Sequence, residues 1–569
     1  MADETANQGI PAPEGEADLI ETDYEIGQDN IQTNLGPFGL DIHNPVFLIS
    51  GLSIIVFVLY ALLLPDQASS VFSWLFSSVT KGFDWFFLGA ANILVIFCLV
   101  LIVTPFGSVR LGGKEASPDY SYVGWFAMLF AAGMGIGLVF FGVSEPMSHF
   151  SSSLGGTAME GGARTDWAPL GAAGGDEAAA QRLGMAATIF HWGLHPWAIY
   201  AVVALALALF TYNKGLPLTL RSAFYPIFGE RVWGWTGHII DTLAVFATLF
   251  GLATSLGFGA EQAASGLTFL FGSGDATEGT RAFLGITYGN TDESGVANNP
   301  ILLVILIGAI TAIALVSVVR GLDGGVKVLS EINMGLAGLL LLFVFFVGGP
   351  IFLLTLFWDS LLAYLEFLIP LSNPFGREDV NFSQGWTSFY WAWWISWSPF
   401  VGMFIARVSR GRTVREFIIC VLLIPSLVCV LWMTVFGGTA INQFVNEGYE
   451  AAKNASLELK LFYMLEPLPL AGITSFIGIV LVVVFFVTSS DSGSLVIDTI
   501  TAGGKVDAPV SQRVFWCIFE GTVAIVLLVG GGLAALQSAV ISTGLPFTLV
   551  LLLMCYAIYK GLASERANT

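Results

Sequence analysis

The sequence predicts an all-α integral membrane protein with twelve transmembrane helices. Of its 569 residues, 55% are hydrophobic and only 11% are charged, whereas about 25% of the residues in a typical soluble protein are charged. The mean hydropathy is +0.77, and nearly uncharged stretches of about 20 residues, each long enough to cross a bilayer, recur along the chain. A transmembrane β-barrel is excluded, because it would show short segments of alternating polarity instead.

The charge of the chain and its first 44 residues narrow the possible functions. A formal net charge of −20 argues against nucleic-acid binding, which needs a basic patch. Residues 1–44 contain ten carboxylates and no Lys or Arg, so we predict an acidic, mostly disordered cytoplasmic tail. The five cysteines all lie in apolar segments, and we expect neither a disulfide framework nor a cofactor.

The apolar segments give the expected spans and the regions between them. Between the seventh and eighth spans, residues 357–383 predict an amphipathic interfacial helix, because Asp359 and Glu366 alternate with apolar residues at helical spacing. Residues 561–569 are expected to form a short C-terminal tail. Hydropathy places the spans at about 45–65, 84–107, 120–144, 185–210, 236–270, 299–319, 330–356, 384–407, 415–437, 470–490, 513–535 and 538–559.

The distribution of basic residues predicts the orientation. If the N-terminus lies inside, the inner segments carry about two thirds of the 22 Lys and Arg residues, including the densest basic loop at 407–415. Because basic loops tend to stay in the cytoplasm, we expect both termini there. The protein is then a multi-pass protein of the inner or plasma membrane of the cell.

Two of the spans contain residues that interrupt a helix. In the third span, GMGIG places Gly133, Gly135 and Gly137 at alternate positions, which weakens a helix. In the eighth, Pro399 removes one backbone donor. These spans are five apart, which is the pattern of inverted-repeat transporters with a site at the membrane midplane. The predicted units are two additional spans over 45–119, a first inverted repeat over 120–356 and a second over 384–560.

Aromatic residues are concentrated in the fourth and eighth spans. They are Trp192, Trp197 and Tyr200 in HWGLHPWAIY, and Trp393, Trp394 and Trp397 in WAWWISW. An interfacial aromatic belt is the usual interpretation of isolated tryptophans, but those of the eighth span lie about a dozen residues inside it, at mid-membrane depth. A cage of indole faces without carboxylates suits a quaternary ammonium group, whose diffuse charge is attracted by cation–π interactions.

Four stretches of sequence carry a resemblance to a known family. They are GMGIG with SEP (133–137 and 144–146), HWGLHPWAIY (191–200), FYWAWWISWSPFVGMFIARVSRGR (389–412) and VTSSDSGS (487–494). At these residues, and over nearly all of 45–560, the chain resembles the betaine/choline/carnitine transporter family, most closely its sodium-coupled glycine betaine members. The resemblance implies a twelve-helix secondary transporter of LeuT-like fold with two inverted five-helix repeats, often a homotrimer embedded in membrane lipid.

The resemblance also implies which residues bind substrate and sodium. The family's aromatic cage corresponds to the six aromatic residues above, and the substrate carboxylate faces the backbone of Gly133, Met134 and Gly135. Without the resemblance, hydroxyls in spans more often bond to their own or a neighbouring helix. The implied sodium site consists of carbonyls of Ala131, Met134 and Phe485 with hydroxyls of Thr488 and Ser489.

The family's second sodium site matches this sequence only in part. The resemblance places it at Thr248 and Phe400, with a hydroxyl-bearing residue at position 252. This chain has Leu252 there and Thr254 two residues later. Because leucine has no side-chain oxygen, the site is absent or built differently, or the stoichiometry is reduced.

The function implied by the resemblance is import of glycine betaine or a related zwitterionic compatible solute, by sodium symport with alternating access. Members that prefer choline often carry an acid where this chain has Gly137, so the sequence favours a zwitterion. Dimethylsulfoniopropionate, carnitine, ectoine and choline stay open as substrates. Proton coupling and sodium-independent exchange stay open as mechanisms.

A distant alternative is an intramembrane hydrolase built on His191 and His195, which are four apart like a metal-binding pair. A metalloprotease of this kind has Glu directly after the first histidine as general base, whereas this chain has Trp192. No third metal ligand is evident from the sequence. We therefore expect no catalytic residues and no enzyme activity.

Three acidic residues in or near spans need an explanation, because such residues are functional candidates by default. Glu145 precedes Pro146 and is expected to mark a helix end. Asp491 is expected at the cytoplasmic end of the tenth span. Glu520 is expected to pair within the bundle.

Overall fold

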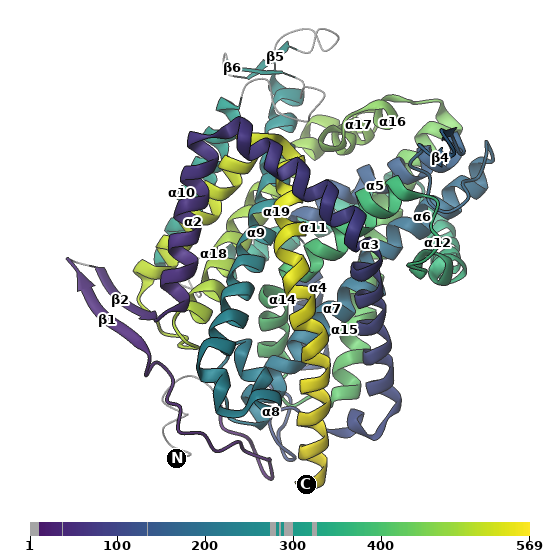
Figure 1. Ribbon diagram of the computed structural model, residues 1–569. Coiled ribbons are helices and arrows are strands. Elements are labelled where there is room, and N and C mark those ends of the chain that lie inside the picture. Colours follow the sequence, from purple (N-terminus) through teal and green to yellow (C-terminus); the bar gives the residue numbers. More distant parts are fainter. Residues whose placement is uncertain are drawn as a thin grey trace.

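The computed structural model describes residues 11–36, 38–133, 135–272, 280–283, 286–289, 300–320 and 327–568. These residues form a bundle whose long helices run side by side along the height of the molecule (Figure 1). In the described part of the chain, ten helices are long and apolar enough to cross a membrane. The prediction of an all-α multi-pass membrane protein is confirmed, whereas the number of twelve spans stays a prediction.

The helices follow the predicted apolar segments. The uninterrupted long helices are α2 (Val46–Leu63), α3 (Pro65–Val103), α9 (Trp235–Phe271), α10 (Ile301–Arg320), α11 (Lys327–Val347), α12 (Pro350–Ser372), α14 (Ser388–Val408), α15 (Val414–Glu447) and α18 (Ala471–Thr501). Two predicted spans are divided, into α4 (Tyr122–Gly133) with α5 (Ile136–Gly155) and into α6 (Glu177–Trp192) with α7 (Leu194–Ala208). The last two predicted spans lie within α19 (Val510–Asn568).

Short elements connect the long helices. The short helices are α8 (Tyr225–Phe228), α13 (Val380–Phe382), α16 (Ala451–Asn454) and α17 (Lys460–Leu465), with single turns of 3-10 or π helix at Pro105–Ser108, Leu209–Asn213, Arg221–Phe224, Gly229–Trp233, Ser383–Thr387 and Leu457–Leu459. The described strands form antiparallel pairs, β1 (Asn30–Leu35) with β2 (Phe38–His43), β3 (Met159–Glu160) with β4 (Ala163–Arg164), and β5 (Thr280–Phe283) with β6 (Ile286–Gly289).

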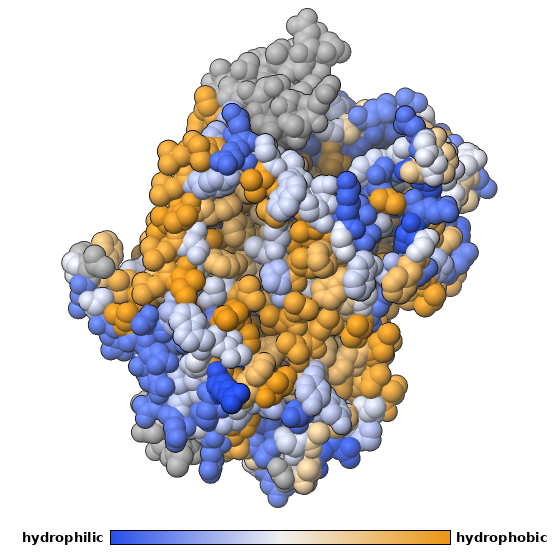
Figure 2. Space-filling model, in the orientation of Figure 1, coloured by the Kyte–Doolittle hydropathy of each residue, from blue (hydrophilic) through white to orange (hydrophobic). Residues whose placement is uncertain are grey.

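The surface of the bundle is divided by polarity. Figure 2 shows hydrophobic residues over the middle of the visible face and hydrophilic residues gathered towards its lower end and its upper right. On α2, the exposed side chains include Leu52, Val56, Leu59 and Leu62. An exposed apolar surface of this kind is stable only in contact with lipid or another apolar partner.

Helix breaks occur at one of the two predicted places. The expected break in the third span is present, because α4 ends at Gly133 and α5 begins at Ile136. The expected break at Pro399 is wrong, because α14 runs through this residue. Proline leaves the carbonyl four residues earlier without its helical donor, and here the Ser398 hydroxyl donates to the Ile395 carbonyl over 2.7 Å. That hydrogen bond replaces the missing one and keeps α14 continuous.

Two further helix breaks depend on glycines. In α19, Gly532 has φ 61° and ψ −151°, which separates the helix into two segments at a kink. The seventh predicted span ends at Val347 rather than at 356, because Gly349 adopts φ 93° and Pro350 starts α12. Positive φ is accessible to glycine at little steric cost. The break at Gly532 lies close to the predicted boundary at 535–538, whereas α11 ends nine residues before the predicted end at 356.

Helix α12 carries the residues of the predicted interfacial helix. Asp359 and Glu366 both form ion pairs with Arg182 of α6, the second at 2.8 Å. Exposed apolar side chains on the same helix include Ile351, Leu354, Trp358, Leu362 and Leu365. The helix therefore has a polar side towards α6 and an apolar side facing outward, and its position in the membrane interface stays a prediction.

The prediction that residues 1–44 are mostly disordered is wrong for residues 11–36 and 38–44, while residues 1–10 lie outside the described part. Glu14 pairs with Arg410 at 2.6 Å and Asp41 with Lys505 at 2.6 Å. Tyr24 stacks on Trp233, with ring centroids 4.3 Å apart and planes 10° from parallel. The segment has no cation of its own, and its carboxylates bind basic residues of loops distant in sequence.

The two ends of the described chain meet on one face of the bundle. Lys214 pairs with Asp18 at 2.6 Å and with Glu565 at 2.8 Å, at the lower end of the molecule in Figure 1. Residues 561–568 continue α19 as helix instead of forming a separate tail. Both ends on one face agree with an even number of membrane crossings.

Candidate functional site

The break between α4 and α5 produces an exposed helix N-terminus inside the bundle. Gly135 is extended (φ −166°, ψ −176°), and no side chain caps α5. The first N–H groups of a helix have no partner within the helix, and the helix dipole places partial positive charge there. Gly133 ends α4, whereas Met134 lies outside the described residues. This N-terminus is suited to an anionic group.

A pocket lies directly at this N-terminus. The six predicted aromatic residues all line it, and Gly135 and Gly137 contribute the α5 side. The remaining lining residues are Leu138, Pro196, Ser255 and Cys429.

The aromatic rings around the pocket include one stacked pair and two rings that meet it nearly at right angles. Trp393 and Trp394 stack, with ring centroids 4.7 Å apart and planes 13° from parallel. Trp192 meets Trp394 edge to face at 4.9 Å and 72°. Tyr200 does the same from another side, at 6.3 Å and 79°. The rings therefore form walls of different orientation around one space.

The indole N–H groups of all five pocket tryptophans donate to protein acceptors. The acceptors are Glu145 Oε2 for Trp192 (2.6 Å), the Trp192 carbonyl for Trp197 (3.2 Å), Ser255 Oγ for Trp393 (3.1 Å), the His191 carbonyl for Trp394 (2.8 Å) and the Gly251 carbonyl for Trp397 (2.8 Å). These bonds fix the ring orientations. What the indoles offer to an occupant is therefore their π surface.

The burial of these rings argues against the interfacial-belt interpretation. Trp192, Trp393 and Trp394 are 5%, 1% and 6% exposed, whereas Trp358 on α12 is 64% exposed. Belt tryptophans lie on the outer surface at headgroup level. The pocket tryptophans face the interior of the protein instead.

The two histidines of the hydrolase hypothesis do not act as a pair. Gly193 separates α6 from α7, so the spacing of four does not place His191 and His195 on one helix face. His191 contacts Glu145 through Nδ1 (2.6 Å) and Thr387 through Nε2 (3.0 Å). His195 contacts the Asn92 side-chain oxygen through Nε2, over 3.0 Å.

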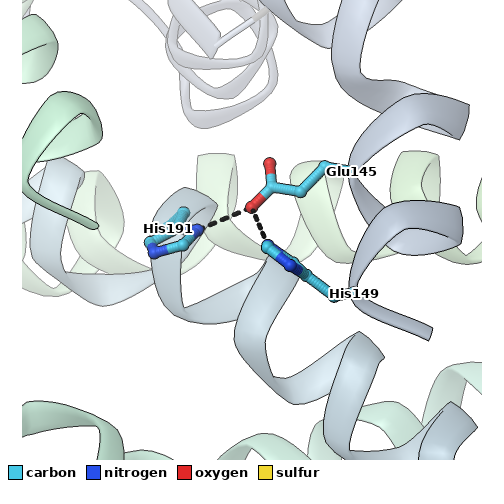
Figure 3. Close-up of side chains that lie close together, drawn as sticks. All are labelled: Glu145, His149 and His191. Atoms are coloured by element: carbon cyan, nitrogen blue, oxygen red, sulfur yellow. Dashed lines mark hydrogen bonds and ion pairs between the residues drawn. The ribbon is translucent and has the colours of Figure 1, made fainter. Parts of the chain in front are cut away.

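The prediction that Glu145 marks a helix end is wrong. It does not end a helix, because α5 continues through Pro146 to Gly155. Its carboxylate is fully buried, and His149 and His191 point towards it (Figure 3). Ligand atoms of these three residues lie within 4.8 Å of one another, as a metal site requires. A possible signal was the spacing of Glu145 and His149, four apart within an apolar span.

Comparisons with known proteins identify the family. A model of the betaine/carnitine/choline family of transporters (BCCT) matches residues 45–567. The chain belongs to the betaine/carnitine/choline transporter family. It is 65% identical, over 98% of its length and 97% of the relative, to a glycine betaine/proline/choline transporter of Vibrio parahaemolyticus. A second protein of that organism, glycine betaine transporter 1, is 55% identical over 96% and 98% of the two chains.

A more distant relative has a related name. A glycine betaine transporter of Bacillus subtilis is 41% identical over 90% of this chain and 92% of its own. Membership of this family makes the protein a multi-pass membrane transporter and not an enzyme.

The residues of the implied first sodium site lie on two elements of this family member. Ala131 is in the last turn of α4, and Phe485, Thr488 and Ser489 are on α18. The Thr488 hydroxyl contacts the carbonyls of Val484 at 3.1 Å and Phe485 at 3.2 Å. It is thus bonded to its own helix, as hydroxyls in spans often are. The Phe485 carbonyl can still accept a cation through its second lone pair.

At position 252 of the implied second sodium site, this transporter has no side-chain oxygen. Leu252 is buried and packs against Gly493, whose added Cβ would lie 2.2 Å from Leu252. The Thr254 hydroxyl contacts the carbonyls of Phe250 (2.8 Å) and Leu536 (3.1 Å). Thr248 bonds back to the carbonyl of residue 244 over 2.8 Å. The ring of Phe400 lies 5.4 Å from that of Trp397.

The other acidic residues lie deep in the transporter. Asp491 is fully buried in α18 and pairs with Arg513 at 3.0 Å, so its side chain does not face solvent, whereas its location at the cytoplasmic end of the span stays a prediction. Glu520 accepts a hydrogen bond from Ser490 at 2.8 Å. Glu520 therefore bonds within the bundle, as predicted.

Proposed function

We propose that this transporter imports glycine betaine or a related zwitterionic compatible solute by sodium symport with alternating access. The observation that supports this most is the aromatic pocket at the α5 N-terminus. Among the described residues that line it there is no Asp, Glu, Lys or Arg. An occupant held there must present a cation to ring faces and an anion to backbone N–H groups.

The cationic end of the substrate would be bound by the tryptophans. A quaternary ammonium group has no classical hydrogen-bond donor, so it leaves water for an apolar cage at a lower cost than a protonated amine does. Each indole face is worth about 2 kcal/mol or more to a desolvated cation. The stacked pair of Trp393 and Trp394 and the perpendicular Trp192 present three such rings to one space.

The carboxylate of the substrate would bind at the start of α5. Gly135 lines the pocket, and a Cβ added to it meets no atom within 4 Å, so the backbone is open there. Helix N-termini bind anions through exposed N–H groups and the dipole. This supports the proposed role of the Gly133–Gly135 backbone.

The names of the relatives support this substrate class. The Bacillus subtilis relative is named for glycine betaine, and the Vibrio parahaemolyticus relative at 65% identity for glycine betaine, proline and choline. Gly137 bears on the choice, because an added Cβ would lie 3.0 Å from the ring edges of Trp192 and Trp393. An acidic side chain at this position would need those rings to move.

Sodium coupling is proposed from the oxygen-bearing residues on α18 and from the resemblance. Na⁺ is a hard cation that takes several oxygen ligands, which Phe485, Thr488 and Ser489 can supply together with the α4 carbonyls. Leu252 argues for one sodium site rather than two. We also propose that the protein works as a homotrimer in the inner or plasma membrane, with its termini in the cytoplasm.

The experiment that tests the function is uptake of labelled glycine betaine into proteoliposomes containing the purified protein. We expect accumulation with an inward sodium gradient and none when potassium replaces sodium at the same pH. Equal uptake in both buffers would contradict sodium coupling and favour proton coupling or exchange. No betaine uptake or binding under any condition would contradict the substrate class.

A further inference from the structure

A carboxylate lies directly behind the aromatic pocket, outside its lining. Glu145, on α5, is fully buried, and its Oε2 accepts the indole N–H of Trp192 over 2.6 Å and the hydroxyl of Tyr390 over 2.5 Å. Its Oε1 contacts His191 Nδ1 at 2.6 Å and His149 Nε2 at 3.1 Å (Figure 3). The four partners come from α5, α6 and α14.

These four contacts suit an ionised carboxylate. A carboxylate offers about four lone-pair sites and can only accept, and an indole can only donate. With both histidines neutral, each donates one proton to Oε1, and His191 Nε2 accepts the Thr387 hydroxyl at 3.0 Å. The charge is therefore stabilised by hydrogen bonds from neutral groups, and it is not cancelled by a Lys or Arg among these partners.

Trp192 lies between the Glu145 carboxylate and the pocket, so the carboxylate can attract a cation in the pocket but cannot contact it. Trp192 lines the pocket, and its N–H is bonded to Glu145 on the side away from it. The carboxylate oxygens are fully used, so a small cation in the pocket cannot coordinate them. Its electrostatic field still acts across the ring, because attraction between charges is strong where water is excluded. A hydrogen bond to an ionised acceptor also polarises its donor.

We propose that Glu145 is a positioning and specificity residue for the substrate cation. It holds the Trp192 ring in place and supplies a fixed negative charge that attracts an ammonium group without contacting it. This rests on the proposed function, because it assumes that a quaternary ammonium occupies the pocket. It explains how a cage without lining carboxylates prefers a methylated ammonium to a small hydrated ion.

The first test separates charge from packing by comparing two ligands of one shape. Choline and its uncharged carbon analogue 3,3-dimethylbutanol differ in the cationic nitrogen. We expect the wild-type protein to bind choline at least tenfold more tightly than the analogue, and Glu145→Gln to reduce that ratio at least fivefold. Glu520→Gln, which replaces another buried carboxyl group, bonded to Ser490, should leave the ratio unchanged. A ratio preserved in Glu145→Gln would overturn the proposal.

The second test does not depend on the folding of Glu145→Gln. Trp192→Phe keeps a ring but removes the donor to Glu145, and we expect the half-saturating betaine concentration to rise about tenfold, with maximal uptake retained. Trp391→Phe is the matched control, because the Trp391 indole N–H has no partner among the described residues. Equal affinities of the two variants would contradict the positioning role.

A double variant and a chelator complete the test. In the double variant Glu145→Gln/Trp192→Phe, the fold loss of betaine affinity should be smaller than the product of the two single-variant fold losses, because each substitution breaks the same hydrogen bond. EDTA should leave wild-type affinity unchanged. Loss of affinity in EDTA that zinc restores would assign Glu145, His149 and His191 to a metal and overturn the proposal. If the wild-type protein binds no quaternary ammonium compound, the proposed function fails. If the wild type binds such compounds but the variants do not differ as described, only the proposal for Glu145 fails.

Discussion

Trp394 donates its indole N–H to the backbone carbonyl of His191 over 2.8 Å. This bond joins α14 to the last turn of α6, and so it joins the two groups of aromatic residues, which the sequence places in different repeats. The ring of Trp394 also stacks on Trp393 and meets Trp192 edge to face. Trp394 is therefore one of the residues through which the two halves of the cage contact each other, together with Trp393, whose ring meets that of Trp192 at 6.4 Å.

Replacing Trp394 with leucine removes this contact and one cation–π surface. We expect the half-saturating betaine concentration to rise about 30-fold, corresponding to about 2 kcal/mol, while the protein still reaches the membrane. The measurement is labelled betaine uptake normalised to surface protein. Trp358→Leu on α12 is the control, because that ring is 64% exposed. An unchanged half-saturation in Trp394→Leu would exclude the cage as the substrate site.

Gly137→Ala should narrow the pocket. The added Cβ would lie 3.0 Å from the Cη2 atoms of both Trp192 and Trp393, and such overpacking costs about 1–3 kcal/mol. We expect glycine betaine affinity to fall about tenfold and dimethylglycine affinity to fall less. Gly155→Ala, at the open end of the same helix, meets no atom within 4 Å and serves as control. Equal losses for both ligands would show that the cage does not surround the methyl groups.

Thr488→Val should weaken the apparent affinity for sodium more than the apparent affinity for betaine. The change removes one oxygen of the proposed site and keeps the shape of the side chain, so we expect the half-saturating sodium concentration to rise about tenfold. At saturating sodium, the half-saturating betaine concentration should stay near the wild-type value. The control is Thr355→Val, which removes an exposed hydroxyl bonded to the Ile351 carbonyl at 2.9 Å. An unaltered sodium dependence would remove Thr488 from the site.

Docking of the N-terminal segment should depend on pH through His43. Burial, followed by the charge of Arg221, lowers the pKa of His43 from 6.5 to about 3. The Arg221 guanidinium donates to His43 Nε2 at 3.0 Å, which holds the ring neutral. The undocked segment therefore binds more protons below pH 6.5. Docking is fully present above that pH and weakens by about 1.4 kcal/mol for each unit below it.

Amide hydrogen exchange of residues 38–43 measures this effect. After correction for the intrinsic exchange rate, we expect protection to fall about fivefold between pH 6.5 and about pH 5.5. His43→Asn lacks the titrating group, so its protection should not change over this interval. Protection that is equal at both pH values in the wild type would contradict the linkage.

The sequence predicted that these aromatic residues lie around one space, because helical spacing is a local property. Trp393, Trp394 and Trp397 share a face through intervals of three and four residues, and the α14 helix realises that spacing. The break at GMGIG was also local, since alternate glycines weaken any helix. The same reasoning failed at Pro399, because it did not consider that the neighbouring hydroxyl of Ser398 could supply the missing donor.

The unpredicted features depend on partners far apart in the chain. Glu145 looked like a helix end beside proline, and its donors Trp192 and Tyr390 are 47 and 245 residues away. The N-terminal segment looked disordered from its composition, because its cations, such as Arg410, lie about 400 positions later in the sequence. Composition and periodicity describe a segment alone, and they contain no information on such pairings.

The hydrogen bonds from the five indole N–H groups to protein acceptors have a thermodynamic consequence for substrate binding in the pocket. Water there is surrounded mainly by hydrocarbon and π faces and finds few hydrogen-bond partners, so it gains bonds when an incoming solute returns it to bulk solvent. Calorimetry should therefore show betaine binding that releases heat at 25 °C together with a negative heat-capacity change. Betaine binding would then be driven by enthalpy, although the surface that it covers is largely apolar.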